Sequence, residues 1–253
     1  MFALTVPTSL PPSPGVVLYG IPLLAVGVAA LFLWAVARVS SGRTTAVLGA
    51  LTVAWMTLTA GLAHAGVLLR FDLRPPPMLL LMICLFGLGI GIGVSRLGAR
   101  LAALPAATLV LAQAFRLPLE LVMHEAAASG VMPHVLSFSG YNFDVLTGAL
   151  AIPVGLALRA NPARRGLLML WNALGSVCLI VIAFIALASS PLVMLWGAQS
   201  LNLWVLHFPY VWLPAVMVLF AVAGHAVVWR KLLTARTARS GTPASQAESA
   251  TAE

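Results

Sequence analysis

Residues 103–125 read ALPAATLVLAQAFRLPLELVMHE, and this stretch decides how the rest of the chain is arranged. It is long enough to cross a bilayer core of about 30 Å. It also contains the polar residues Gln113, Arg116, Glu120 and His124. Hydropathy therefore leaves its crossing in doubt, and the charges of the flanking segments are needed to decide it.

Six further apolar runs lie around this stretch. They cover residues 16–37, 45–69, 77–94, 143–158, 166–188 and 208–229. Of the 253 residues, 61% are hydrophobic and only 8% are charged, whereas a soluble domain carries about 25% charged residues. The sequence predicts an all-α, polytopic integral membrane protein with a bundle of seven transmembrane helices. The composition excludes most soluble enzymes, nucleic-acid modules and disulfide scaffolds.

The basic residues indicate the orientation of the chain. Eleven of the 14 follow the first, third, fifth and seventh spans: Arg38, Arg43, Arg96, Arg100, Arg159, Arg164, Arg165, Arg230, Lys231, Arg236 and Arg239. Loops rich in Lys and Arg stay in the cytoplasm, so we expect the N-terminus outside and the C-terminus cytoplasmic, in a cell membrane of the bacterial plasma-membrane (inner-membrane) type. If residues 103–125 did not cross, the basic cluster at 159–165 would face outward. The charge bias therefore favours a crossing, and it explains the net charge of +8 without nucleic acid.

The two ends of the chain differ in composition from the apolar region at 16–231. Residues 1–15 contain several prolines and no charge, which predicts an irregular extracytoplasmic lead-in. Residues 232–253 are rich in Thr, Ala, Ser and Gly and have no apolar period. Such a segment buries too little surface to offset its chain entropy, so we expect a disordered cytoplasmic tail.

Four glycines alternate with apolar residues in the third span, at Gly87, Gly89, Gly91 and Gly93. At helical spacing they form two overlapping GxxxG pairs, which allow a neighbouring helix to approach closely. A phosphate-binding loop would need a preceding strand, which an apolar span does not offer. The run therefore predicts helix packing.

Four of the polar residues of 103–125 fall on one stripe of a helix that turns about 100° per residue: Gln113, Arg116, Glu120 and His124. Charged groups at membrane depth cost about 2.5 to 3.5 kcal/mol each, so they usually face the bundle interior or a wet cavity. We expect Arg116 and Glu120 to pair at i, i+4, with His124 one turn further out. Neighbouring spans contribute Asp144 or His64, and His225 is placed outside the cluster. The candidate ligand-binding set is Gln113, Arg116, Glu120, His124, Asn142 and Asp144.

Three functions are compatible with this pattern, and no motif identifies an enzymatic reaction. In the first, the stripe lines an outward-facing cavity that binds or conducts a small polar or charged solute, with Glu120 or His124 as the proton carrier. In the second, His64 and His124, with His207, hold a haem or a metal ion for membrane redox work or cofactor assembly. In the third, the chain is a structural subunit of a larger membrane complex. An Arg–Glu pair with a purely structural role is the alternative to any working site.

A retinal protein is excluded, because the Schiff base needs a buried lysine. The single lysine, Lys231, lies beside Arg230 at the cytoplasmic end of the last span. The partners that the sequence predicts are the lipid bilayer and a small-molecule solute, with no nucleic acid.

Overall fold

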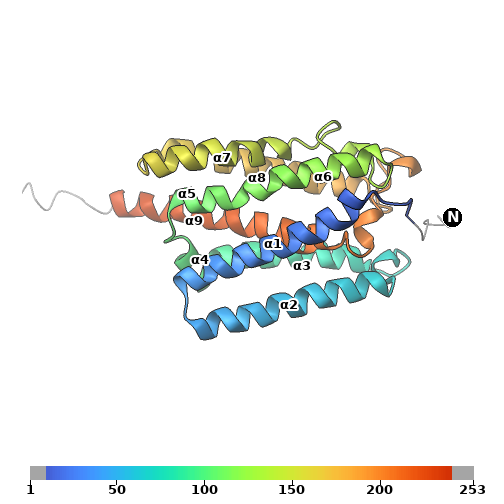
Figure 1. Ribbon diagram of the computed structural model, residues 1–253, viewed down its shortest axis with the longest axis horizontal. Helices are drawn as coiled ribbons and strands as arrows, with labels where there is room; N and C mark the ends of the chain where they lie inside the picture. The colour runs from blue at the N-terminus through green and yellow to red at the C-terminus, as the bar shows by residue number, and fades with distance from the viewer. Residues whose placement is uncertain (1–9, 241–253) are drawn as a thin grey trace, which may run out of the picture.

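The computed structural model describes residues 10–240, and throughout that range the regular elements are helices (Figure 1). Six helices in the described part are long and apolar enough to cross a membrane: α1 (Gly15–Val39), α2 (Gly42–His64), α3 (Pro77–Val94), the composite helix Ala106–Ala128, α8 (Arg165–Ala188) and the composite helix Leu213–Thr234. The predicted fifth span is α7 (Asp144–Ala160), which has 17 residues and is not among the six. The all-helical, multi-pass membrane architecture is confirmed, and a seventh crossing stays a prediction.

The helices carry apolar side chains outward and polar ones inward, the reverse of a soluble protein. Leu23, Leu170 and Ile180 are 70%, 69% and 69% exposed. In contrast, Arg116 and Glu120 are 1% and 2% exposed. Water would not solvate such an exterior, whereas lipid chains match it.

The helix that decides the fold is broken in its middle. It consists of α5 (Ala106–Leu111), the 3₁₀ turn η2 (Ala112–Phe115) and α6 (Arg116–Ala128). Pro118 lies in the first turn of α6, and a proline there removes a backbone donor. A 3₁₀ stretch inside a long helix often marks a hinge or a functional position. Arg116 is the first residue after this break. The short helix α4 (Arg96–Leu101) connects α3 to this part of the chain.

Two spans differ from the prediction by five residues or more at an end, whereas the ends of the other five spans differ by three residues or fewer. The second span ends at His64 and not at 69, because Gly66 adopts a left-handed φ of 67° that stops the helix. The short turn η1 (Val67–Leu69) follows. The last span begins five residues later than predicted, with the π-helix η6 (Leu213–Val218). The Ala215 carbonyl in this π-helix accepts a hydrogen bond of 2.8 Å from Nε1 of Trp55 in α2.

The C-terminal helix α9 (Leu219–Ser240) extends beyond the predicted transmembrane region. Residues 232–240 are therefore helical, although their composition predicts an irregular tail. The remaining part of that predicted tail, 241–253, lies outside the described residues, as do residues 1–9 of the predicted lead-in. Residues 10–14 precede α1 and are not helical.

Only one of the two predicted glycine pairs packs against another helix. A Cβ atom on Gly89 would lie 2.7 Å from Cγ1 of Val222 in α9, and one on Gly93 would collide with Ala226. A Cβ atom on Gly87 or Gly91 would meet nothing within 4 Å. The close contact of α3 with α9 therefore uses Gly89 and Gly93, and the prediction for the other pair is wrong because that side of α3 faces outward.

The basic turns gather at one end of the bundle (Figure 1). This basic end contains the turns α1–α2, α3–α4 and α7–α8 and the C-terminal part of α9, at the left of the view. The opposite end, called the loop end below, contains the segments between α2 and α3, between α6 and α7, and between α8 and η6. The helix α2 lies along one edge of the bundle and α7 along the other, and α1 runs obliquely across the face between them (Figure 1).

Candidate functional site

Arg116 forms a buried ion pair with Asp144. Its Nε atom donates to Oδ2 at 2.7 Å, and Nη2 lies 2.5 Å from Oδ1. The two side chains are 1% and 8% exposed. The predicted pairing of Arg116 with Glu120 is wrong. A long helical side chain tilts toward the N-terminus of its helix, which directs Arg116 away from the residue four positions later.

Asp144 contacts the guanidinium of Arg116 from the first position of α7. A carboxylate is stabilised at a helix N-terminus. The backbone N–H of Asp144 also donates to Oδ1 of Asn142 at 3.0 Å, which fixes the start of the helix. One turn further on, a Cβ atom on Gly148 would lie 2.9 Å from the carbonyl carbon of Arg116. The absence of a side chain at Gly148 therefore brings the first turns of α6 and α7 together.

Glu120 is held by Asn142 and not by a basic residue. The Nδ2 group of Asn142 lies 2.9 Å from both carboxylate oxygens of Glu120. Within the described residues the ion pairs are Arg70–Asp72 and Arg116–Asp144. Arg116, Glu120, Asn142 and Asp144, called the charged cluster below, thus contain two carboxyl groups and one guanidinium. As predicted, these four residues lie together.

His225 also belongs to this site, although it was placed outside. Its Nε2 atom is 2.9 Å from Nη1 of Arg116, and its Nδ1 atom is 2.8 Å from Oδ1 of Asn172. A guanidinium only donates, so Nε2 must accept, and the ring is neutral with its proton on Nδ1. The ring stacks on Trp171 at 5.3 Å, and Gly175 of α8 leaves room for it.

The length of α9 explains why the sequence did not place His225 correctly. Measured from the predicted end at residue 229, His225 lies about 6 Å from the cytoplasmic boundary. Measured along α9 to Ser240, it lies about 22 Å from the helix end, close to the middle of the bundle. The signal in the sequence that could have placed His225 in the site was Asn172, a polar residue at a matching depth on α8.

A chain of side-chain hydrogen bonds runs from the loop end toward Glu120. His134 Nε2 lies 3.1 Å from Ser139 Oγ, which lies 3.2 Å from Ser137 Oγ, which lies 3.1 Å from His124 Nδ1. His134 and Ser139 are exposed, whereas Ser137 is fully buried. His124 lies one turn outward from Glu120 on α6, as predicted. These four side chains are called the serine–histidine chain below.

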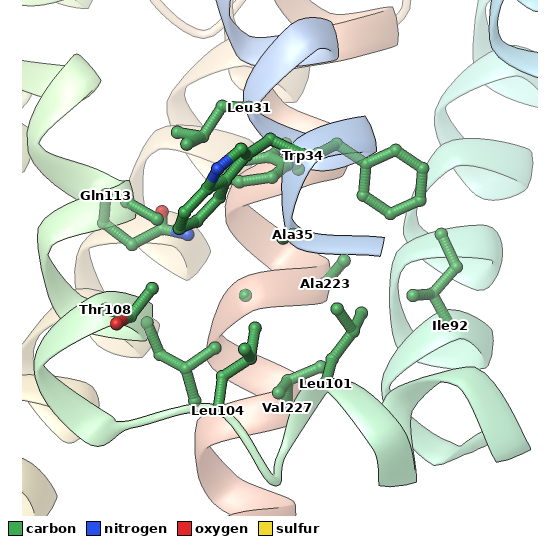
Figure 2. A pocket seen from close by; sticks show the side chains of 15 residues that line it. Leu31, Trp34, Ala35, Ile92, Leu101, Leu104, Thr108, Gln113, Ala223 and Val227 are labelled. Carbon is green, nitrogen blue, oxygen red and sulfur yellow. The ribbon is translucent and has the colours of Figure 1, made fainter. Parts of the chain in front are cut away.

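Gln113 lies on the other side of Arg116, toward the basic end. It is 1% exposed and packs against the backbone at Gly224 of α9. With Trp34 and Thr108 it lines a space of about 50 Å³ that is otherwise apolar (Figure 2). In the described part of the chain its Oε1 atom has no hydrogen-bond partner. Gln113 is therefore close to the charged cluster along the helix, but it is not bonded to it.

The remaining candidate histidines lie elsewhere. His64 is exposed at the end of α2, on the edge of the bundle opposite α7 (Figure 1). His207 is half-buried between α8 and η6, and this burial lowers its pKa below the usual value of 6.5. Among the described residues no group of three or more His, Cys, Asp or Glu side chains could hold a metal ion. The structure therefore does not bring His64, His124 and His207 together as a metal site.

The chain matches no known protein family, no curated protein and no solved structure. What the site can do is set by its charge and its surroundings. One guanidinium neutralises one of two buried carboxyl groups, and the second carboxyl group lies next to a hydrogen-bonded chain that reaches the surface.

Proposed function

We propose that this chain is a membrane protein that binds or conducts a small polar or charged solute at the charged cluster, coupled to a proton that Glu120 exchanges with the loop end. We place it in a plasma membrane of the bacterial type, with seven crossings. In this orientation the loop end faces outward and the basic end faces the cytoplasm, because basic residues concentrate on the cytoplasmic side.

The observation that carries the proposal is that Arg116 is engaged by Asp144, so Glu120 has no cation of its own in the described structure. An uncompensated charge in a poorly hydrated interior is costly. The cluster is neutral when Glu120 holds a proton or when a small cation accompanies it. Intramembrane carboxyl groups of this kind mark proton and ion pathways.

The geometry of the segment between α6 and α7 supports access from the loop end. Because α7 begins at the level of Arg116, this segment must return inward by about 18 Å from the end of α6. Irregular backbone at such depth is tolerated only where protein or a water-filled cavity surrounds it. The segment contributes Ser137 and Asn142, which are both buried, and the exposed side chains of the serine–histidine chain. A proton that enters at His134 has hydrogen-bonding groups as far as His124, one turn from Glu120.

Toward the basic end, the cluster continues through hydrogen bonds to His225 and Asn172. A guanidinium does not give up its proton, and an amide oxygen does not take one, so these bonds hold Arg116 in position and do not relay a proton. The proton step of the proposal therefore lies between Glu120 and the loop end.

Proton flux into proteoliposomes tests this proposal. The full chain is reconstituted with a pH-sensitive dye inside, and a potassium diffusion potential drives protons inward. We expect faster acidification than in empty liposomes, loss of that increment in Glu120→Gln, and its retention in Glu125→Gln. Glu125 is an exposed acid on the same helix, so it is a matched control. Acidification at the rate of empty liposomes, or an unchanged rate in Glu120→Gln, would contradict the proposal.

A further inference from the structure

A second cavity, larger than the one beside Gln113, lies away from the charged cluster. It has a volume of about 470 Å³ and is enclosed by α3, α8, η6 and the segment that joins α8 to η6. Its wall is rich in large apolar side chains, including Met78, Met82, Phe86, Ile182 and Leu213. This volume lies within the range of about 300 to 1,000 Å³ that is typical of ligand pockets.

The cavity reaches the lateral surface of the bundle. Two of the residues that line it, Ile83 of α3 and Leu187 of α8, are 62% and 46% exposed. In a membrane this surface faces lipid chains. A molecule dissolved in the bilayer therefore has a direct way in between α3 and α8.

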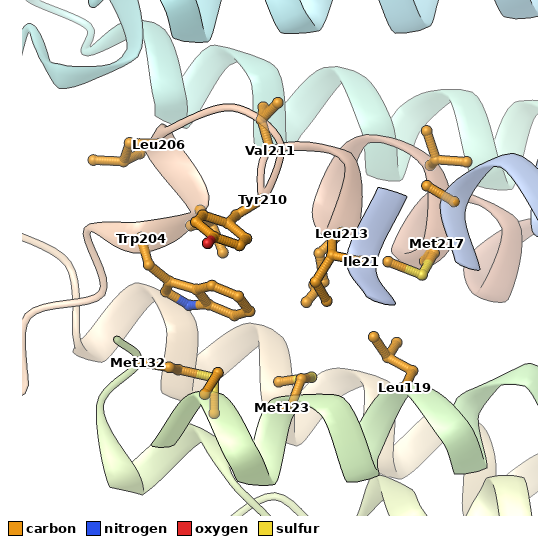
Figure 3. Packing of buried hydrophobic residues seen from close by; sticks show 14 of the residues in the cluster. Ile21, Leu119, Met123, Met132, Trp204, Leu206, Tyr210, Val211, Leu213 and Met217 are labelled. Atoms are coloured by element: carbon orange, nitrogen blue, oxygen red, sulfur yellow. The ribbon is translucent and has the colours of Figure 1, made fainter. Parts of the chain in front are cut away.

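Two polar atoms without partners belong to residues of this apolar wall. They are Nε1 of Trp204 and Oδ1 of Asn202, whose side chains belong to residues that are 1% and 8% exposed. The Trp204 indole lies beside Tyr210 and near Met123 and Met132 (Figure 3). Buried polar groups are nearly always hydrogen-bonded, so an indole donor and an amide acceptor left unpaired at one cavity indicate a missing partner.

We propose that the cavity binds an uncharged long-chain amphiphile from the bilayer, whose hydroxyl end supplies partners to Trp204 Nε1 and Asn202 Oδ1. A hydroxyl group both accepts and donates, which matches this pair of atoms. Among the described residues that line the cavity none carries a charge, so a phosphate or ammonium head group would be left uncompensated there. The methionines suit a flexible chain, because their side chains adapt to irregular apolar shapes.

Binding of radiolabelled hexadecanol to the full chain in nanodiscs tests the proposal. We expect saturable binding, with hexadecane and hexadecyl phosphate as weaker competitors. Trp204→Phe keeps the aromatic ring and removes the donor, so it should weaken binding by roughly three- to tenfold, the effect of one hydrogen bond. Equal competition by hexadecane, or unchanged affinity in Trp204→Phe, would overturn the assignment of the hydroxyl group to this end of the cavity.

A cavity-filling variant tests the location of the site. Ala183 lines the cavity, whereas Val177 is an exposed residue of the same helix that does not. We expect Ala183→Trp to abolish hexadecanol binding and Val177→Trp to leave it unchanged. Binding that survives in Ala183→Trp, or that is lost equally in both variants, would contradict the proposal.

Photolabelling of the unaltered chain provides a test that does not depend on the folding of a variant. A hexadecanol with a diazirine in its chain should label residues of α3 and α8 that line the cavity, such as Met82 and Leu187. Excess hexadecanol should suppress that labelling. Labelling confined to other helices, or labelling that hexadecanol does not suppress, would overturn the proposal.

Discussion

Arg116 connects its own helix, α6, to two others, because two nitrogens of its guanidinium face Asp144 and the third faces His225. It is paired with Asp144 at the start of α7, and it donates to His225 in the second turn of α9. These contacts are buried, so no water is there to replace a partner that is removed. The structural role of this ion pair is therefore separable from the role of Glu120, which is not part of it.

Removing one member of the ion pair should destabilise the protein strongly. Arg116→Met or Asp144→Leu leaves an unpaired buried charge, which costs about 3 to 5 kcal/mol. The double variant removes both charges and should recover much of that loss. Denaturant unfolding of the purified variants in detergent measures the difference. Equal stability of Arg116→Met and the unaltered protein would show that the pair is not buried in this way.

Gly175 sets the position of the His225 ring. A Cβ atom there would lie 2.7 Å from His225 Nε2, so Gly175→Ala should displace the ring and weaken its bond to Arg116. We expect a loss of about 1 to 3 kcal/mol, as is usual for overpacking. Gly166 on the same helix has nothing within 4 Å of its Cβ position, so Gly166→Ala is the control. An equal midpoint temperature of thermal unfolding in the two variants would contradict the packing of His225 against α8.

At the scale of helices, the contact between α3 and α9 depends on two glycines with a specific orientation. Gly89 faces Val222, whereas Gly91 faces outward with free space. A leucine at Gly89 would force the two helices apart. This difference provides a pair of substitutions within two residues of each other.

Gly89→Leu should lower the folded yield and the thermal stability by an amount typical of core overpacking, about 1 to 3 kcal/mol. Gly91→Leu should have little effect or a stabilising one, because leucine favours a helix more than glycine does. Size-exclusion chromatography and thermal unfolding in detergent measure both. If Gly91→Leu is the more damaging variant, the assigned face of α3 is wrong.

The helical spans could be predicted from the sequence because each depends on local hydropathy, and α3 agrees with its prediction at both ends. The interior position of Arg116, Glu120 and Asp144 could also be predicted from the sequence, since charges avoid lipid. The pairing of Arg116 with Asp144 could not be predicted from the sequence. It depends on which residue begins α7 and on the depth of His225, and both are set by packing between helices that are far apart in the chain.

For the whole molecule, the concentration of basic residues at one end predicts its orientation in the membrane. A fluorescent protein fused after Ser240 should be fluorescent, and alkaline phosphatase fused there should be inactive, because the basic end is predicted to be cytoplasmic. A phosphatase inserted at Gly130, which is exposed at the loop end, should be active. The opposite pattern of activities would invert the orientation.

The central claim is that Glu120 exchanges a proton with the outside because Arg116 is committed to Asp144. Infrared difference spectroscopy of the protein in lipid, recorded while the external pH is changed, tests it most directly. We predict a carboxyl C=O band that follows the external pH, is absent in Glu120→Gln and is retained in Glu125→Gln. A band that persists unchanged in Glu120→Gln, or a spectrum without any such pH-dependent carboxyl band, would contradict the account.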